Sequence, residues 1–313
     1  MQAGKKPVVV VGSINIDLVV RAERIPVEGE TVQGRDFQIH PGGKGANQAV
    51  AVGRLGYPVA MIGRIGDDAF GEQLREHLAG AGVDISAVAV SPGTSGVAVI
   101  VVSDNGENSI VITPGANAHV STTDIDANLE LIRSAGVVLA QLEIPILTVL
   151  HLARICAREK VPLILDPAPA QELPAELFEI VEWFTPNETE AAFFTGNADA
   201  ESSSTMAQFL MGKGIKGVLL KLGSRGVYIA TRAHVAEQLP PFAVKAVDTT
   251  AAGDAFNGAF ATGLMMNLTP VESARFAAAA AAVSVTRPGA QPSMPSIAEV
   301  EQMLHSATGS SDS

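Results

Sequence analysis

Hydrophobic and polar positions along the chain follow two different periods. The continuous apolar run at residues 7–12 (PVVVVG) is typical of a buried parallel strand that ends in a glycine turn. Phe70, Leu74 and Leu78 are four residues apart, which predicts an amphipathic helix. From residue 136 onward, apolar strands alternate with helical patterns. We therefore expect a three-layer α/β/α, Rossmann-like fold with a mostly parallel sheet and helices on both faces.

Two stretches interrupt this rhythm, because residues 14–40 and 96–114 carry strand patterns without helices. The second contains Asn105-Gly106, a strong signal for a hairpin turn. We interpret both stretches as a small β-sheet lid grown from the edge of the main domain. A disordered tail is expected at residues 306–313. The main domain then comprises three segments, residues 1–13, 41–95 and 115–305.

Composition restricts the class of partner. Hydrophobic residues make up 47% of the 313 residues and charged residues 17%, which allows a sizeable core. The chain carries 33 acidic and 21 basic side chains, for a formal charge of -12. This balance argues against nucleic acid or an anionic membrane as the main partner, although a local pocket can still be positive.

Cysteine and histidine offer little metal or redox chemistry. Cys156 is the only cysteine, so neither a disulfide framework nor a cysteine zinc site is expected. The histidines are scattered without the spacing of metal ligands. No apolar run reaches the length of a membrane span or a signal-peptide core, and we expect a cytoplasmic protein.

Residues 248–256 (DTTAAGDAF) combine two aspartates with small residues at the expected start of a helix. Asp254 beside Gly253 suits the free amides and the dipole of a helix N-terminus. Alternatively, those amides bind an anion while Asp254 accepts a proton beside it. The local pattern is compatible with both interpretations.

Residues 41–49 (PGGKGANQA) place three glycines around Lys44 just before a helical pattern. Glycines let the backbone approach a ligand closely, and a helix N-terminus favours anions or hydroxyl oxygens. The stretch is not a Walker P-loop, because Gly45 stands where Ser or Thr is required. The alternative is a glycine-rich turn with Lys44 in solvent and Asn47 bonded to a local amide.

Asn15 and Asp17 are predicted to face the same side of an extended segment, because strand side chains alternate. Their groups suit a polyhydroxylated ligand, and a simple turn after the first strand is the alternative. Glu143 ends an apolar strand, at the edge where open α/β sheets bind ligands. Residues 221–226 (KLGSRG) form either a tight hairpin turn or part of a nucleotide site.

Asn187 and Glu190 have the spacing of a helix capping box, which explains their pattern completely. The functional alternative is that both face a hydrated divalent ion or a phosphate at the end of the preceding strand.

Taken together and in this order, PGGKGANQA and DTTAAGDAF resemble the two signature motifs of the ribokinase family, the PfkB-type carbohydrate kinases. The resemblance extends from GSINID near the N-terminus to GAQPSMPS near the C-terminus. It implies a ribokinase-like fold and ATP-dependent phosphorylation of a sugar, with D-ribose phosphorylated at O5 as the expected reaction. It also implies a homodimer formed through the lid.

The resemblance implies roles for the residues that match the family's motifs. Asp254 would be the general base, and the amides of Ala251, Ala252 and Gly253 would form an anion hole for the γ-phosphoryl group. The sugar hydroxyls would be held by Asn15, Asp17, Gly43, Lys44, Asn47 and Glu143. The nucleotide would be flanked by Asn187, Lys221, Gly223, Gly226 and Gly253.

Metal roles follow from the same resemblance. Asn187 and Glu190 would act around Mg2+ and phosphate. A monovalent cation, usually K+, would be bound by Asp248, Thr250, Ser284, Gly289 and Ser293. One departure is Lys221, because many members of the family have Thr at this position.

Two alternatives to ribose phosphorylation remain. The first is a kinase of the same fold that acts on deoxyribose, fructose, a keto-deoxy sugar acid or a nucleoside. The second is a sugar or nucleotide sensor without catalysis, against which the intact Asp254 and glycine turn argue.

Overall fold

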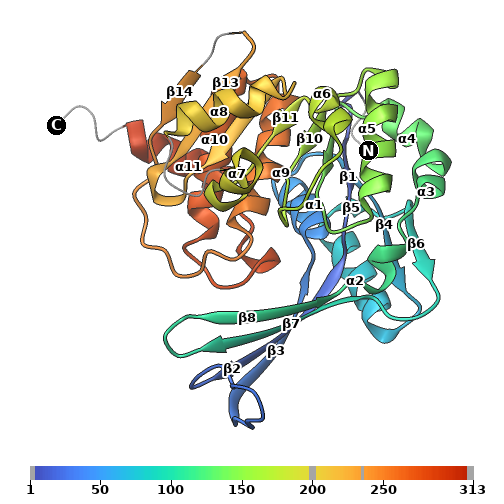
Figure 1. Ribbon diagram of the computed structural model, residues 1–313, viewed down its shortest axis with the longest axis vertical. Coiled ribbons are helices and arrows are strands. Elements are labelled where there is room, and N and C mark those ends of the chain that lie inside the picture. The colour runs from blue at the N-terminus through green and yellow to red at the C-terminus, as the bar shows by residue number, and fades with distance from the viewer. Residues whose placement is uncertain (1–3, 197–201, 234–235, 309–313) are drawn as a thin grey trace.

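The central sheet of the protein is mostly parallel, as seen in a computed structural model that describes residues 4–196, 202–233 and 236–308 (Figure 1). Its strand order is β14-β13-β12-β11-β10-β9-β1-β4-β5, and β6 also pairs with β4. Among the strands described, antiparallel pairing in this sheet is confined to one edge, where β13 pairs with β12 and β14. The strands are β1 (Val8–Val11), β4 (Val59–Gly66), β5 (Val83–Asp84), β6 (Val88–Ser91), β9 (Val137–Ala140), β10 (Leu163–Leu165), β11 (Trp183–Phe184), β12 (Gly217–Lys221), β13 (Val227–Thr231) and β14 (Ala236–Leu239).

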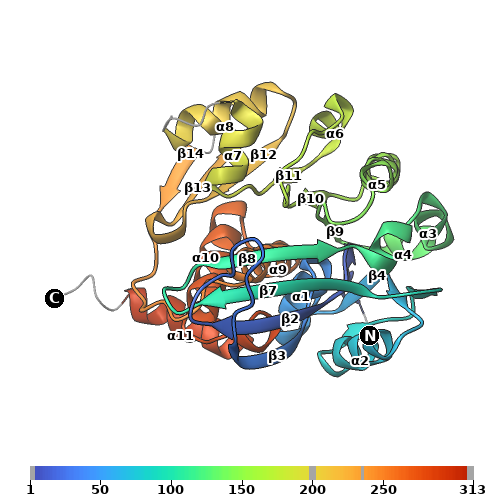
Figure 2. The ribbon, with the colours of Figure 1, turned by 60° about the horizontal axis from the view of Figure 1, so that its bottom comes forward.

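Helices cover both faces of this sheet, which confirms the three-layer prediction (Figures 1 and 2). One face is covered by α1 (Lys44–Arg54), α2 (Ala69–Gly80), α9 (Ala252–Met265), α10 (Pro270–Ser284) and α11 (Ile297–Thr308). The other is covered by α3 (Thr122–Ala127), α4 (Leu129–Ser134), α5 (Ile146–Glu159), α6 (Ala175–Ile180), α7 (Glu188–Thr195) and α8 (Ser203–Gly212).

Strand β1 shows why its sequence is continuously apolar. Val8 and Val10 pack into one core layer, and Val9 and Val11 pack into the other. All four side chains are fully buried, as expected for a central parallel strand with helices on both sides. The apolar run therefore predicts both the strand and its central position.

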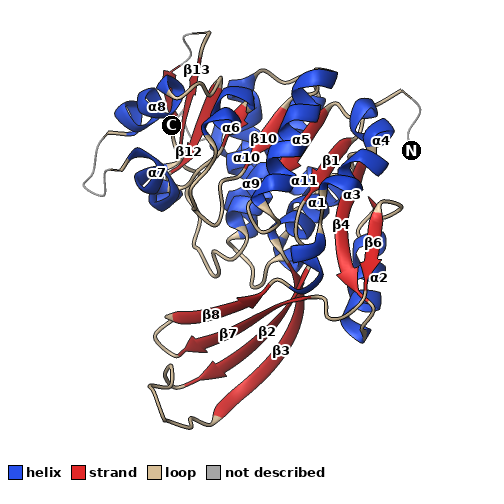
Figure 3. Cartoon of the chain, turned by 45° about the vertical axis from the view of Figure 1, so that its right-hand side comes forward, coloured by secondary structure: helices blue, strands red, loops and turns tan. Residues whose placement is uncertain are grey.

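A second, four-stranded sheet projects from the helix-covered body (Figures 1 and 3). Its order is β3-β2-β7-β8, with bounds Gly34–Gly42, Asn15–Ala22, Gly96–Ser103 and Asn108–Thr113. Strands β7 and β8 form the antiparallel hairpin that Asn105-Gly106 predicts, and Gly106 has a positive φ of 86°.

Two predicted boundaries need correction. Strand β3 continues to Gly42, so a boundary at residue 40 would divide a strand that pairs with β2 along its whole length. Helix α11 continues to Thr308, so residues 306–308 are helical rather than part of a disordered tail. The remainder of the predicted tail, residues 309–313, lies outside the described residues.

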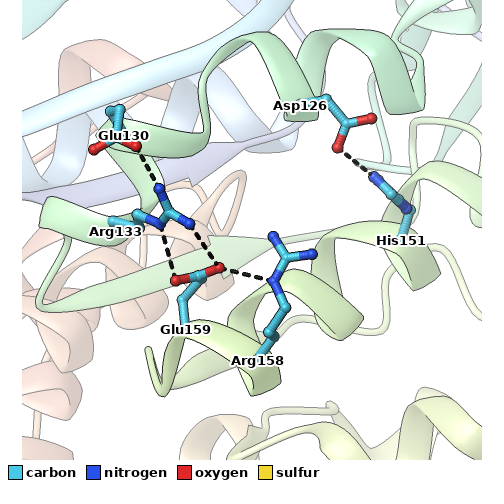
Figure 4. A network of polar contacts seen from close by, with 6 residues as sticks. All are labelled: Asp126, Glu130, Arg133, His151, Arg158 and Glu159. Carbon is cyan, nitrogen blue, oxygen red and sulfur yellow. Dashed lines mark hydrogen bonds and ion pairs between the residues drawn. The ribbon is translucent and has the colours of Figure 1, made fainter.

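Helices α3, α4 and α5 are joined at the surface by ion pairs (Figure 4). Arg133 Nε lies 2.9 Å from Glu159 Oε2, and the same guanidinium contacts Glu130. His151 Nε2 lies 2.8 Å from Asp126 Oδ1. Exposed pairs of this kind add little stability, so the apolar contacts beneath them hold these helices on the sheet. Within the described ranges, no helix has both the length and the apolar character needed to cross a membrane.

Candidate active site

The candidate polar residues gather at the carboxyl ends of the central strands, where open α/β sheets bind ligands. Glu143 and Asp166 follow β9 and β10, and Lys221 ends β12. Lys44 begins α1 and Asp254 lies in the first turn of α9, two helices that pack against each other. Five segments distant in sequence thus contribute to one site.

The Asp254 carboxylate is buried and faces helix α1. Its Oδ2 accepts a 2.9 Å hydrogen bond from Asn47 Nδ2, and its Oδ1 accepts a 3.1 Å bond from Gln48 Nε2. The N-cap position of α9 is Ala251, and no side chain caps the helix. The side chain of Asp254 therefore bonds to another helix, and does not act as a cap.

The charged side chains at the site interact with one another. Burial alone would lower the pKa of Lys44, but Asp254, Asp166 and Glu143 raise it above its usual value. Burial raises the pKa of Asp254 to about 6, with Lys44 opposing the shift and Asp166 adding to it. Lys44 is half-buried and its charge interacts with a group of carboxylates, so it does not lie free in solvent.

The turn before α9 has strained backbone. Ala251 has a left-handed φ of 57°, which is costly for a residue with a Cβ. The Ala252 amide donates a 3.2 Å hydrogen bond to Thr249 O, which lies in the turn before the helix. The first amides of a helix have no hydrogen-bond acceptor within the helix itself. Helix N-termini of this kind are suited to binding anions.

The glycines of residues 42–45 allow α1 to begin against the chain that follows β1. A Cβ on Gly45 would lie 2.7 Å from Ser13 N, and one on Gly43 would lie 2.7 Å from Asn15 N. A Cβ on Gly42 would lie 2.2 Å from Asp17 Oδ2. These glycines were expected to let the backbone approach a ligand closely. In the structure they allow close contact with the protein's own backbone and with Asp17.

Asn15 and Asp17 lie at the start of β2, where the two sheets meet. Asn15 Oδ1 accepts a 2.6 Å bond from Asn117 Nδ2. Burial raises the pKa of Asp17 to about 7, and the charges of Glu143 and Asp254 add to the shift. Asp17 therefore lies close enough to Glu143 and Asp254 for their charges to act on its carboxyl group.

Glu143 closes the same side of the site. Its Oε2 accepts hydrogen bonds from Ser13 Oγ at 2.5 Å and from the Lys44 amide at 3.1 Å. A cavity of about 400 Å³ beside it is lined by Asn15, Ile112, Pro114, Asn117, Ala118, Leu142, Glu143, Ile144, Pro145, Ile146, Pro169 and Gln171. Convergent polar groups beside a cavity fit a small polar ligand.

A larger cavity, of about 610 Å³, lies on the other side of the turn before α9. Its wall is mostly apolar and includes Phe242, Val244, Phe256 and Val285. The hairpin turn at residues 221–226 contributes Lys221, Gly223 and Gly226, and α9 contributes Ala252 and Gly253. The hairpin interpretation of KLGSRG is correct, and the same turn lines a cavity that can hold a nucleotide base.

The capping box at α7 is present. Asn187 Oδ1 accepts from Glu190 N at 2.8 Å, and Glu190 Oε2 accepts from Asn187 N at 2.8 Å. Burial raises the pKa of Glu190, and Lys221 acts against the rise. Among the described residues, no group of three or more His, Cys, Asp or Glu side chains is arranged to hold a metal ion.

Asp248 joins two loops near the end of α10. Its Oδ1 accepts from Thr250 N at 2.9 Å, and its Oδ2 accepts from Gly289 N at 2.8 Å. The hydroxyls of Ser284 and Ser293 donate to carbonyls in their own turns, and both residues are buried. Hydrogen bonds therefore bring together Asp248, Thr250 and Gly289 of the predicted cation site. The hydroxyls of Ser284 and Ser293 form their hydrogen bonds within their own elements.

Comparison with known proteins identifies the family of this chain. A family model described as pfkB family carbohydrate kinase matches residues 5–297. A ribokinase from Haemophilus influenzae is 42% identical over 306 residues, covering 97% of this chain and 100% of that protein. The chain belongs to the pfkB family of carbohydrate kinases.

Solved structures of this kinase family share the fold. Ribokinase from Thermotoga maritima matches with a TM-score of 0.89 and 39% identity, covering 96% of this chain and 99% of that one. Ribokinase from Arabidopsis thaliana, solved with ribose and ATP, matches with a TM-score of 0.88 and 38% identity over the same shares of the two chains.

Two polar residues of the candidate site, Asp166 and Gln48, were not predicted from the sequence. Asp166 accepts from Lys221 Nζ at 2.9 Å and from Gln48 Nε2 at 3.0 Å. It directly follows the buried strand β10, and this position was a usable signal. Gln48 is a fully buried amide on α1, whose other buried residues apart from Asn47 are Ala, Val and Gly, and this was a second signal.

Proposed function

We propose that this protein transfers the γ-phosphoryl group of ATP to O5 of D-ribose, giving ribose 5-phosphate and ADP. The observation that carries the proposal is the position of Asp254. Its buried carboxylate lies in the first turn of α9, next to Gly253 of the larger cavity, and its charge acts on both Asp17 and Lys44 on the other side of the site. The Arabidopsis thaliana ribokinase structure with ribose and ATP supports this choice of substrates.

In the proposed step, the O5 hydroxyl of ribose attacks the γ-phosphorus atom. The new O5–P bond forms while the bond from phosphorus to the bridging oxygen of ADP breaks, and the O5 proton passes to Asp254. A carboxylate can serve as this base because the hydroxyl becomes strongly acidic only as the new bond forms. The proton acceptor and the anion site would then lie on opposite sides of one hydroxyl group.

Charge stabilisation is assigned to the turn before α9. The amides of Ala251, Ala252 and Gly253 would bind the oxygens of the phosphoryl group in transfer, and the Ala252 amide would give up its bond to Thr249 O to do so. Fixed amides at a helix end need no reorganisation during the reaction, which makes them effective at stabilising developing charge. Phosphoryl transfer relies on positioning and electrostatics more than on covalent participation by the protein.

The sugar would be held by the groups on the α1 and β2 side of the site. Carboxylate and amide groups can accept from and donate to several hydroxyls at once. This role is assigned to Asn15, Asp17, Gly43, Lys44, Asn47 and Glu143. The four-stranded sheet, to which Asn15 and Asp17 belong, would close over the sugar and exclude water.

Two cations complete the proposal. Mg2+ bound to ATP reduces the charge of the phosphates, and it commonly retains water and substrate oxygens as most of its ligands. Asn187 and the buried Glu190 are the groups of this chain that would face it. K+ is assigned to the loops joined by Asp248 and Gly289.

A coupled ADP-release assay over ribose, deoxyribose, fructose, a keto-deoxy sugar acid and a nucleoside tests the function. Ribose should give the highest kcat/KM. Higher kcat/KM for another acceptor would reassign the substrate within the same kinase fold. Binding of sugar and ATP without ADP release on any acceptor would instead indicate a sensor.

A further inference from the structure

Lys221 lies at the border between the nucleotide cavity and the candidate base. Its side chain is 13% exposed, and its Nζ lies 2.9 Å from Oδ1 of Asp166, which is 2% exposed. By contrast, Lys216 lies just before the same strand and pairs with Glu182, and their side chains are 43% and 36% exposed, respectively. A buried pair loses the solvation of both ions, so stability alone is a weak reason for its presence.

The ammonium group of Lys221 lies beside the turn before α9. An atom placed as a Cβ on Gly253 would be 3.3 Å from Nζ. Lys221 and Gly253 also line the same cavity. An oxygen bound to the Gly253 amide would therefore be near the ammonium group.

A chain of hydrogen bonds links this ammonium group to Asp254. Gln48 Nε2 donates to Asp166 Oδ2 at 3.0 Å and to Asp254 Oδ1 at 3.1 Å. Gln48 Oε1 accepts from Gln141 Nε2 at 2.7 Å, which fixes the orientation of the amide. The positions of Lys221 and of the base are therefore set by one connected network.

The balance of charge favours a second protein cation beside Lys44. Asp254, Asp166, Glu143 and Glu190 all act electrostatically on Lys44. A phosphoryl group that carries negative charge would be repelled by these carboxylates. Lys221 is the cation placed on the nucleotide side of them, where it can offset that repulsion.

We propose that Lys221 is a catalytic residue that binds the phosphoryl group in transfer, and that Asp166 is the positioning residue that holds its ammonium group beside Gly253. This inference rests on the proposed kinase function. Lys221 would donate a charge-assisted hydrogen bond to a non-bridging oxygen of the γ-phosphoryl group. It gives up no proton, since the O5 proton goes to Asp254 and the leaving oxygen remains on ADP.

The test compares Lys221→Met with the double variant Asp166→Asn/Lys221→Met. The single variant leaves Asp166 buried without its cation and should lower Tm, whereas the double variant removes both charges and should recover Tm. We expect kcat to remain reduced by about 100-fold in both variants, with ADP affinity changed by less than about threefold. Lys216→Met, which breaks the exposed pair, is the matched control and should keep the wild-type kcat.

Asp166→Asn alone keeps the ammonium group but weakens its anchor. We expect kcat to fall by about tenfold with KM for ribose nearly unchanged, as for a residue that acts through another. Recovery of both Tm and wild-type kcat in the double variant would overturn the proposal, because Lys221 would then only neutralise Asp166. If the wild-type protein phosphorylates no sugar, the proposed function itself fails, an outcome distinct from this one.

Discussion

Asp254 illustrates how one carboxylate can have two local interpretations that only its neighbours can separate. Its position near a helix N-terminus fits a cap, yet its oxygens bond to Asn47 and Gln48 of α1. These partners are about 200 residues away in sequence, with separations of 207 and 206, so no local pattern could reveal them. Burial also raises the pKa of Asp254, whereas the charge of Lys44 and the hydrogen bonds from Asn47 and Gln48 act against the rise.

The acid limb of the pH–rate profile is a consequence of these raised pKa values. Burial raises the pKa of Asp17 to about 7 and that of Asp254 to about 6, and the ionised carboxylates are the forms that accept a sugar hydroxyl bond or the O5 proton. We expect kcat/KM for ribose to rise with pH through this range in an assay from about pH 5 to about pH 9. In the Asp17→Asn variant, kcat/KM should follow a single titration, near pH 6. A flat profile would contradict both assignments.

The same groups should affect stability in the opposite direction. Their folded pKa values lie above the ordinary value of 3.8, so the folded state binds protons more tightly than the unfolded state. Their contribution to the free energy of unfolding is therefore greatest below about pH 4, and it falls as pH rises through about 6 to 7.

Ala251 offers a residue-scale test of backbone strain. Its left-handed φ of 57° favours glycine, so Ala251→Gly should raise the free energy of unfolding by about 0.5 to 1 kcal/mol. Ala157→Gly, at an exposed site within α5, is the matched control and should lower it by up to about 1 kcal/mol. Denaturant unfolding measures both, and a destabilised Ala251→Gly variant would contradict the strain argument.

At the scale of elements, hydrophobic period predicted most of the fold. The run at residues 7–12 and the spacing of Phe70, Leu74 and Leu78 correspond to β1 and α2. The pairing of Asp166 with Lys221 could not be predicted, because it requires knowing that β10 and β12 lie on either side of β11. Hydrophobic periodicity predicts individual helices and strands, whereas the residues of a site depend on the order of the strands in the sheet.

The loops joined by Asp248 give a prediction at this scale. Asp248 binds the Gly289 amide, so a cation held by these loops would stabilise the turn before α9 from one side. We expect K+ to activate the kinase more than Na+, and Asp248→Asn to remove the difference. Initial rates at fixed ionic strength measure this. Rates that do not depend on the monovalent cation in the wild-type protein would eliminate the proposed site.

At the scale of the whole molecule, the four-stranded sheet has two different faces. Strand register places Phe37 opposite Val20, and both Ile39 and Val99 beside Leu18. Val111 lies opposite Val99, which puts these apolar residues on one face. Asp17 directly precedes Leu18 in β2, so its side chain points to the other face of the sheet. The face away from Asp17 is therefore apolar, with Phe37 56% and Val111 65% exposed.

This apolar face supports the predicted homodimer. Phe37→Glu should shift the protein toward monomers, because burying a charge in such an interface is costly. Glu107→Lys, at the exposed end of the β7–β8 hairpin, is a charge-changing control that should leave the association state unchanged. Sedimentation velocity measures both. A wild-type protein that remains monomeric at all concentrations would contradict the prediction.

The most direct test of the central claim is single-turnover phosphorylation of ribose by Asp254→Asn, with Asp126→Asn on the exposed surface as control. The asparagine keeps the shape of the side chain but cannot accept the O5 proton. We predict that turnover falls by about 100-fold or more, while equilibrium binding of ribose and ATP stays nearly intact. Near-normal turnover in Asp254→Asn would show that this carboxylate is not the base.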